Sequence, residues 1–259
     1  MAKMNAVLKI ALAALCINLP LMHPDTPNRD MSDRGSAVQA LPLDSLDGLE
    51  LKAVSEPGGG IAKLKADVVE YEGRRALHMI NDDSTMGSKG PSGGESLAIV
   101  KGSDFRNGTI DLDLVGMPRP GSNSQSRGFV GIAFRIQGDV EKFENFYLRF
   151  TNGRADDQLR RNHSTQYSSF PDFPWSRLRQ ESPGVYESYV DIEEAAWTKI
   201  KIVVSGTKAK LFVNDAAQPC LIVNDLKLGE GPGRVALWAG SDTEAYFSHL
   251  RIESCCSPP

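Results

Sequence analysis

The side chains best suited to chemistry are concentrated between Glu144 and Glu187. The stretch 145–152, Asn-Phe-Tyr-Leu-Arg-Phe-Thr-Asn, alternates polar and apolar residues. In a strand, this alternation places Phe146, Leu148 and Phe150 in the core, and Asn145, Tyr147, Arg149 and Thr151 on the opposite face. An aromatic ring with a hydroxyl, beside guanidinium and amide donors, is the mixture that sugar recognition requires. We therefore predict ligand binding by Asn145, Tyr147, Arg149 and Asn152.

The next segment, 153–167, is polar and has little to bury. Ordering such a loop is costly unless its charges pair with each other or with a ligand. One interpretation is an ion-pair network, in which Asp156 and Asp157 pair with Arg154, Arg160 or Arg161. The other places Arg160 and His163 at the edge of the sugar site beside Tyr167. His163 would titrate near neutral pH.

An aromatic loop at 171–175 follows, and it leads into a segment expected to be a strand with Arg177 and Arg179 on one face. Trp175 has two interpretations of equal weight, a stacking surface for a pyranose ring or a core anchor for the loop. Trp238 alternates with Val235, Leu237 and Ala239, which favours an orientation toward the ligand. Arg177 and Trp238 complete the predicted ligand-binding set.

Short strands must position these residues. In 109–114 the aliphatic residues share one face and the carboxylates the other, and 197–204 followed by 209–213 has the pattern of a hairpin. Further strands are expected at 49–54, 66–71, 76–80, 96–100, 129–136, 146–151, 186–190, 234–239 and 245–253. With turn residues between them and no helical periodicity, they predict an all-β, two-sheet antiparallel sandwich. The long loops 117–127 and 81–95 are candidates for the rim of a binding site.

The 259-residue chain is 41% hydrophobic and 24% charged, with a formal net charge of -4. That balance argues against a nucleic-acid partner. Residues 1–22 carry two lysines before a short interrupted apolar run, which predicts a signal peptide, with an uncleaved anchor as the alternative. We expect a linker over 23–42, the sandwich over 43–254 and a tail over 255–259. The mature protein would be periplasmic or secreted, without a membrane span.

The cysteines and carboxylates do not form a metal motif. Beyond the leader, Cys220 could pair with either Cys255 or Cys256 in an oxidising compartment. We expect no cofactor. Calcium is conceivable on Asp82, Asp83 or Asp242, but no ligand spacing supports it.

Four C-terminal segments, 197–204, 209–214, 233–238 and 245–252, resemble concanavalin-like and laminin-G-like domains, especially the 3-keto-disaccharide hydrolase-like branch. Those domains share a Trp-led strand, a Val-Asn hairpin, a Gly-led strand and a final Phe-x-x-Leu-x-Ile strand. The resemblance implies a jelly roll and a hydrolase acting on an oxidised sugar. The Glu-x-Asp-x-x-Glu strand of jelly-roll glucanases is absent, because Asp111-Leu112-Asp113 lacks the third carboxylate. A retaining mechanism with two carboxylates therefore has no evident pair.

Three hypotheses follow for function. The first is an exported module that binds a glycan, and the several arginines favour an acidic one. The second is a glycan-active hydrolase or lyase in the same groove. As a lyase, it would use His163 or Tyr167 as the base and Arg149 or Arg160 to stabilise the enolate. The third is a structural or adhesion module without a small ligand.

Overall fold

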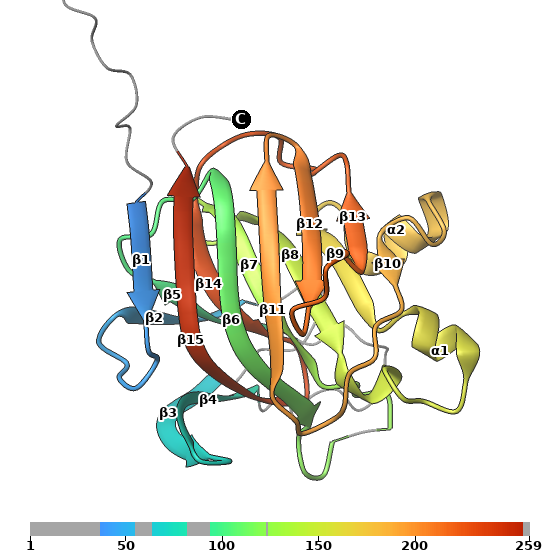
Figure 1. Ribbon diagram of the computed structural model, residues 1–259, viewed down its shortest axis with the longest axis horizontal. Helices are drawn as coiled ribbons and strands as arrows, with labels where there is room; N and C mark the ends of the chain where they lie inside the picture. Colours follow the sequence, from blue (N-terminus) through green and yellow to red (C-terminus); the bar gives the residue numbers. More distant parts are fainter. Residues whose placement is uncertain (1–36, 55–63, 82–93, 123, 256–259) are drawn as a thin grey trace, which may run out of the picture. The chain divides into compact units, whose positions relative to one another are not determined.

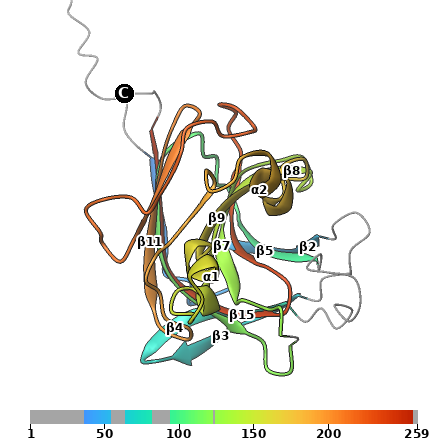
Figure 2. The ribbon, with the colours of Figure 1, turned by 90° about the vertical axis from the view of Figure 1, so that its right-hand side faces the viewer.

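Two antiparallel sheets lie face to face in the computed structural model, which describes residues 37–54, 64–81, 94–122 and 124–255 (Figures 1 and 2). The eight-stranded sheet has the order β13-β12-β11-β6-β15-β4-β3, with β1 also paired to β15. Its strands are β1 (Ala37–Leu41), β3 (Leu64–Tyr71), β4 (Arg74–Asn81), β6 (Asn107–Pro118), β11 (Thr198–Ser205), β12 (Lys208–Val213), β13 (Leu221–Val223) and β15 (Thr243–Cys255).

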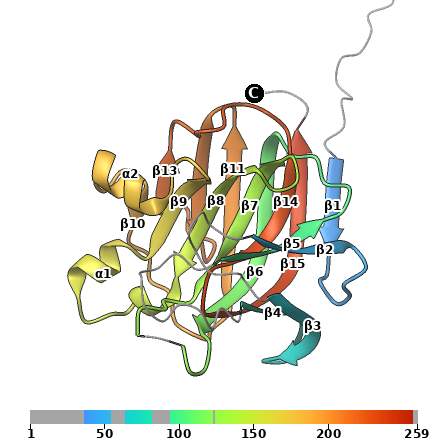
Figure 3. The ribbon, with the colours of Figure 1, turned by 180° about the vertical axis from the view of Figure 1, so that it is seen from behind.

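The seven-stranded sheet has the order β10-β9-β8-β7-β14-β5-β2 and faces the viewer in Figure 3. Its strands are β2 (Leu49–Val54), β5 (Glu95–Val100), β7 (Phe129–Gln137), β8 (Lys142–Arg149), β9 (Thr165–Phe170), β10 (Glu187–Ser188) and β14 (Arg234–Ala239). Two short helices, α1 (Gln158–Asn162) and α2 (Trp175–Glu181), lie at the β9–β10 edge, and a 3-10 turn, η1 (Phe150–Asn152), follows β8.

The main core fills the space between the sheets, because each strand turns its aliphatic side chains inward. Ile110, Leu112 and Leu114 of β6 meet Phe146 and Leu148 of β8 in one buried cluster. The alternation predicted for both strands is confirmed. The all-β, two-sheet antiparallel jelly roll is confirmed with it.

One charged side chain is completely buried at the end of β7. The guanidinium of Arg135 donates to the carbonyl oxygens of Arg106, Gly206 and Gly229. These acceptors satisfy donors that water would otherwise solvate, although burial still lowers the pKa of Arg135. Arg135 therefore joins β7 to the turns at the ends of β6 and β11.

Several sequence-based boundaries were wrong. The folded part begins before Leu43, because β1 pairs with β15 from Ala37↔Ser254 to Leu41↔Leu250. The expected linker 23–42 therefore ends inside a strand. The strand expected at 186–190 is only two residues long, and the strand expected after Trp175 is helix α2. The leader 1–22 and most of the loop 81–95 lie outside the described residues.

Candidate functional site

The predicted sugar-binding residues of β8 lie on the outer face of the seven-stranded sheet. Phe146 and Leu148 enter the core, and Tyr147 joins a second buried cluster made only of side chains from this sheet and its turns. The prediction that Tyr147 and Arg149 share the face opposite the core is confirmed. Asn145 is only 1% exposed and its Oδ1 has no hydrogen-bond partner among the described residues, so it is not the open donor expected.

Tyr147 and Trp238 form the floor of this face. They lie in register on either side of Gly131, and their ring centroids are 4.9 Å apart. A side chain at Gly131 would collide with the backbone of β8, because a Cβ would lie 2.0 Å from the carbonyl oxygen of Phe146. Trp238 Nε1 donates to Glu95 Oε2 at 3.1 Å. Trp238 thus faces the predicted side.

These two rings are not an exposed stacking platform, which corrects the prediction made for them. Tyr147 is 5% exposed and Trp238 is 4% exposed. Burial raises the pKa of Tyr147 to about 12, although the neighbouring Arg149 opposes that shift. The rings support the site from beneath.

Arg149 is a buried cation that is hydrogen bonded mainly to neutral groups. Its Nη1 donates to the carbonyl oxygen of His163 at 3.0 Å, and its Nη2 donates to Tyr147 Oη and to Gln166 Oε1, each at 3.1 Å. Burial lowers the pKa of Arg149. Arg149 therefore holds the end of α1 against β8 and β9.

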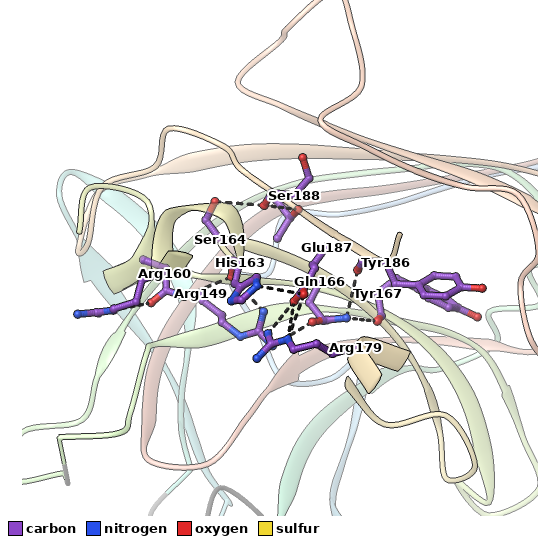
Figure 4. Close-up of polar contacts among 12 residues, drawn as sticks. Arg149, Arg160, His163, Ser164, Gln166, Tyr167, Arg179, Tyr186, Glu187 and Ser188 are labelled. Atoms are coloured by element: carbon purple, nitrogen blue, oxygen red, sulfur yellow. Dashed lines mark hydrogen bonds and ion pairs between the residues drawn. The ribbon is translucent and has the colours of Figure 1, made fainter. Parts of the chain in front are cut away.

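Glu187 gathers the remaining charges of the site (Figure 4). Arg179 donates to both of its oxygens, from Nε at 3.0 and 3.2 Å and from Nη2 at 2.6 Å. His163 Nε2 lies 3.1 Å from Glu187 Oε1. Burial lowers the pKa of His163 and the carboxylate of Glu187 opposes this shift, so the imidazole is mainly neutral near pH 7.

Trp175 begins α2 and lies against two guanidinium groups. The Cζ of Arg179 is 4.7 Å from its ring centroid and that of Arg149 is 5.8 Å away. Both distances fall in the range of cation–π attraction. Arg177 belongs elsewhere, because two residues of a helix separated by one position do not share a face. It pairs with Glu181 at 2.7 Å, and the prediction that it lies with Arg179 was wrong.

The polar segment 153–167 is ordered mainly by local bonds. Asp157 caps α1 by accepting from the backbone N–H of Arg160 at 3.0 Å, and His163 is the residue at the other end of that helix. The guanidinium of Arg160 donates to Asn152 and Thr151. Asn152 is buried and donates to the carbonyl oxygen of His163, so it acts in support of the loop rather than as the exposed ligand group expected.

The expected ion pairs of Asp156 and Asp157 with the arginines of this segment are absent among the described residues, so that interpretation was wrong. Arg154 pairs with Asp191 at 3.0 Å and with Glu193 at 2.6 Å, not with Asp156 or Asp157. The partners come from a later part of the chain.

Tyr167 does not reach the site, and its prediction as a base was wrong. It is completely buried in the core between the sheets. Its hydroxyl donates to Glu144 Oε2 at 2.6 Å and accepts from the backbone N–H of Lys227 at 2.8 Å. Burial and the carboxylate of Glu144 raise the pKa of Tyr167 far above its ordinary value, so its hydroxyl stays protonated and cannot act as a base.

Comparison with solved structures identifies the architecture. The cellulose-induced protein Cip1 superposes with a TM-score of 0.51 at 10% identity, covering 85% of this chain and 100% of that one. A Bacillus subtilis protein of unknown function with a galectin-like fold gives 0.50 at 9% identity, covering 83% and 94%. The fold is that of the concanavalin-like jelly rolls. Carbohydrate-binding module CBM66 from Bacillus subtilis is less close, with a TM-score of 0.46 at 13% identity, covering 74% and 95%.

Comparison of sequences finds no relative, in contrast to the comparison of structures. No family model matches the chain, and no protein of curated function matches its sequence. The narrower resemblance to 3-keto-disaccharide hydrolase-like domains therefore stays a prediction.

Sequence reasoning missed the residues that organise the site. Glu187, Arg179, Gln166 and Glu95 were not among the predicted ligand-binding or catalytic groups. Glu187 could have been found, because it is the one carboxylate in the expected strand 186–190 and lies next to an apolar Tyr186. Nothing local in the sequence indicates that Arg179 would meet it, since that contact depends on α2 folding back onto β9 and β10.

The described part of the candidate site contains no cluster of metal-ligand side chains and no disulfide. In the described part of the chain, no group of three His, Cys, Asp or Glu side chains could hold a metal ion. Asp242 contacts Arg119 at 3.2 Å, and Asp82 and Asp83 lie outside the described residues. Cys220 and Cys255 both have free thiols, and burial raises the pKa of Cys220 to about 12. Of the two pairings that the sequence left open for Cys220, the one with Cys255 is not formed, and the one with Cys256 involves a residue outside the described ranges.

No helix in the described ranges is long and apolar enough to cross a membrane.

Proposed function

We propose that the protein binds a glycan containing an acidic sugar at the α1–α2 end of the outer face of the seven-stranded sheet. The observation that carries this proposal is the pair of guanidiniums on Trp175, from Arg149 and Arg179, with Glu187 as their nearest shared carboxylate. Glu187 is paired with Arg179, whereas Arg149 is hydrogen bonded to neutral groups, so the positive charge of Arg149 has no carboxylate partner among the described residues. A carboxylate on the ligand would balance it.

The exposure of the side chains supports this end of the face as the point of contact. The side chain of Arg179 is 33% exposed and that of His163 is 18% exposed, and Trp175 is half-buried. Charge-assisted hydrogen bonds from arginine to a carboxylate are about twice as strong as neutral ones. The aromatic ring adds apolar contact to the pyranose of the same residue.

Export belongs to the same proposal. Its support is the lysine-flanked apolar run in residues 1–22, outside the described ranges. The mass of the protein recovered from the periplasm or the medium of an expressing cell tests it. A mass that lacks the first twenty or so residues is expected, and a full-length mass in the membrane fraction would favour the uncleaved anchor.

Calorimetry with uronic-acid oligosaccharides and matched neutral oligosaccharides tests the binding proposal. Arg179→Gln should reduce affinity for the acidic set by about tenfold, the loss expected for one charged hydrogen bond. Arg177→Gln is the matched control, because that arginine is on the same helix but pairs with Glu181. Equal loss in both variants, or a preference of the native protein for neutral oligosaccharides, would contradict the proposal.

A glycan-active enzyme is the second candidate, and the contact between His163 and Glu187 favours it. A mainly neutral imidazole held by a carboxylate can accept a proton, and Arg179 could stabilise an enolate formed beside it. Product chromatography on the same oligosaccharides is the test. Products that vanish in His163→Ala while binding persists would establish turnover, and binding without products would leave a binding module.

A further inference from the structure

The outer face of the eight-stranded sheet carries a hollow separate from the site described above. Its volume is about 530 Å³, and it is lined by Arg74, Asp113, Trp197, Lys199, Asn214 and His249 among others. These residues come from β4, β6, β11 and β15 and from the ends of β11 and β12, all in the eight-stranded sheet. Sites for small molecules usually occupy about 300–1,000 Å³, so this hollow is large enough for one sugar ring.

A β-bulge aims one of the lining side chains. The register of β15 against β6 shifts between Ser248 and Arg251, and His249 within the bulge has φ of 53°. The outer neighbour of β15 also changes here, from β4 to β1. Bulges of this kind redirect side chains next to binding sites. Here the redirected imidazole places Nδ1 at 3.2 Å from Asp113 Oδ2.

Five charged side chains line the hollow besides His249, and four of them are already paired with each other; the fifth, Asp111, makes no ion pair among the described residues, and burial raises its pKa. Arg74 Nη1 donates to Asp113 Oδ2 at 2.9 Å, and Lys199 Nζ lies 2.8 Å from Asp215 Oδ1. An anionic ligand would have to displace one of these pairs and would also meet the carboxyl group of Asp111. A neutral ligand with several hydroxyls could instead bond to the capacity that they leave open.

Several groups have such open capacity among the described residues. Asp113 uses only Oδ2 in its contacts with Arg74 and His249, which leaves Oδ1 to accept a hydroxyl. Asn214 uses its Oδ1 to accept from the backbone N–H of Lys199, which leaves its amide N–H groups as donors. Asp113 on β6 and Asn214 after β12 flank Lys199 of β11, so a carboxylate and an amide can bond to neighbouring hydroxyls of one ring.

Nucleophilic catalysis does not fit these groups, although Ser248, His249 and Asp113 are in contact. Ser248 Oγ and Asp113 Oδ2 both approach the same nitrogen of His249, Nδ1, at 3.1 and 3.2 Å. A catalytic relay needs the base and its orienting carboxylate on opposite ring nitrogens. Binding is therefore the role that the geometry supports.

We propose that this hollow is a second saccharide-binding site, which takes one neutral sugar ring and is independent of the site on the seven-stranded sheet. Asp113 accepts from the sugar hydroxyls, Asn214 and Lys199 donate to them, and the imidazole of His249 closes one side. An open, water-exposed hollow implies affinity in the millimolar range.

The three tryptophans of the chain provide the readout. The indole N–H of Trp197 is buried beside the hollow without an acceptor in the described part of the chain, whereas Trp175 and Trp238 belong to the other sheet's outer face. Proton–nitrogen correlation spectra of the full chain would be recorded with methyl glycosides of glucose, galactose and mannose, and Trp197→Phe would assign the signal. We expect a saturable shift of the Trp197 signal with at least one glycoside, while the other two indole signals stay in place.

Asp113→Asn should weaken that binding at least fivefold, about 1 kcal/mol. Glu253→Gln is the matched control, because it makes the same carboxylate-to-amide change outside the hollow. Glu253 pairs with Arg251, which is on β15 like His249, and it does not line the hollow. Asn214→Gly is a second variant: glycine tolerates the positive φ of 51° at this position, so the amide is removed without backbone strain. It too should weaken binding.

The proposal would be overturned if none of the three glycosides shifts the Trp197 signal, or if the shift is equal in Asp113→Asn and in the native protein. A uronic-acid oligosaccharide added to the same samples separates the two sites. Its response at Trp175 tests the function proposed above, and it can succeed or fail whatever happens at Trp197.

Discussion

Single residues in this protein are constrained by the face of the strand to which they belong. Tyr147 and Tyr167 are both nearly inaccessible, yet one supports the candidate site and the other joins the core to the segment after β13. We therefore expect different effects when the hydroxyl of each tyrosine is removed.

Tyr167→Phe should destabilise the fold without changing glycan binding. The substitution leaves a buried oxygen of Glu144 without its donor and the backbone N–H of Lys227 without its acceptor. An unsatisfied buried group costs about 1–3 kcal/mol. Chemical denaturation and calorimetry with the acidic oligosaccharide check the two halves. A variant that folds normally but does not bind would restore Tyr167 to the site.

Tyr147 should make stability fall at alkaline pH. Its pKa is raised from 10.0 to about 12 in the folded protein, so the folded state holds this proton more tightly than the unfolded state. That contribution is complete below pH 10 and is lost as the pH rises toward 12. Tyr147→Phe should reduce the alkaline loss of unfolding free energy by about 1 kcal/mol between about pH 9 and pH 11. Tyr189→Phe, at an exposed tyrosine, is the control, and identical pH profiles for the native protein and Tyr147→Phe would refute the assignment.

At the level of elements, the cap of α1 connects local structure to the site. Asp157 accepts from the first turn of the helix, and His163 follows its last residue. Asp157→Ala should cost about 1 kcal/mol of stability and weaken acidic-glycan binding by loosening His163. Asp157→Asn retains a capping oxygen and should preserve both. Loss of stability without loss of binding would show that α1 does not position His163.

Strand β1 determines where the folded part of the chain begins. Leu41 packs against the main core and β1 pairs with β15 over five residues. A chain that starts at Leu43 should therefore be about 1–3 kcal/mol less stable than one that starts at Gly35. Denaturant titration of the two chains measures the difference. Equal midpoints and slopes would mean that β1 contributes nothing.

The strands could be predicted and the helices could not, for a physical reason. In β6 and β11, burial on one side alone leaves a two-residue period in the sequence, so Ile110, Leu112, Ile200 and Ile202 were assigned correctly. Helices α1 and α2 have five and seven residues, which is too short for a 3.6-residue period to appear. Arg179 belongs to α2, so the contact that it makes with Glu187 of β10 could not be predicted from the sequence.

For the molecule as a whole, the two proposed sites differ in their electrostatics. The net charge is -4, but the site on the seven-stranded sheet has a local surplus of arginine, whereas the ion pairs of the hollow nearly balance. Binding of an acidic oligosaccharide should weaken as salt is raised from low to physiological concentration, because screening at about 0.15 M acts over about 8 Å. Methyl glycosides at the hollow should show no such dependence. Calorimetry measures the salt dependence for the acidic oligosaccharide, and nuclear magnetic resonance titration measures it for the methyl glycosides. The same salt dependence for both would mean that one site takes both ligands.

The antiparallel pairing of β1 with β15 also determines how the protein responds to force. Ala37 lies opposite Ser254, so the first and last strands have their free ends at the same end of the pair. Tension applied between those ends would break the hydrogen bonds between the two strands one after another, starting at that end. It would not load all of the bonds in shear at once. Because β1 belongs to the eight-stranded sheet, the first extension under load would leave the candidate site on the outer face of the other sheet intact.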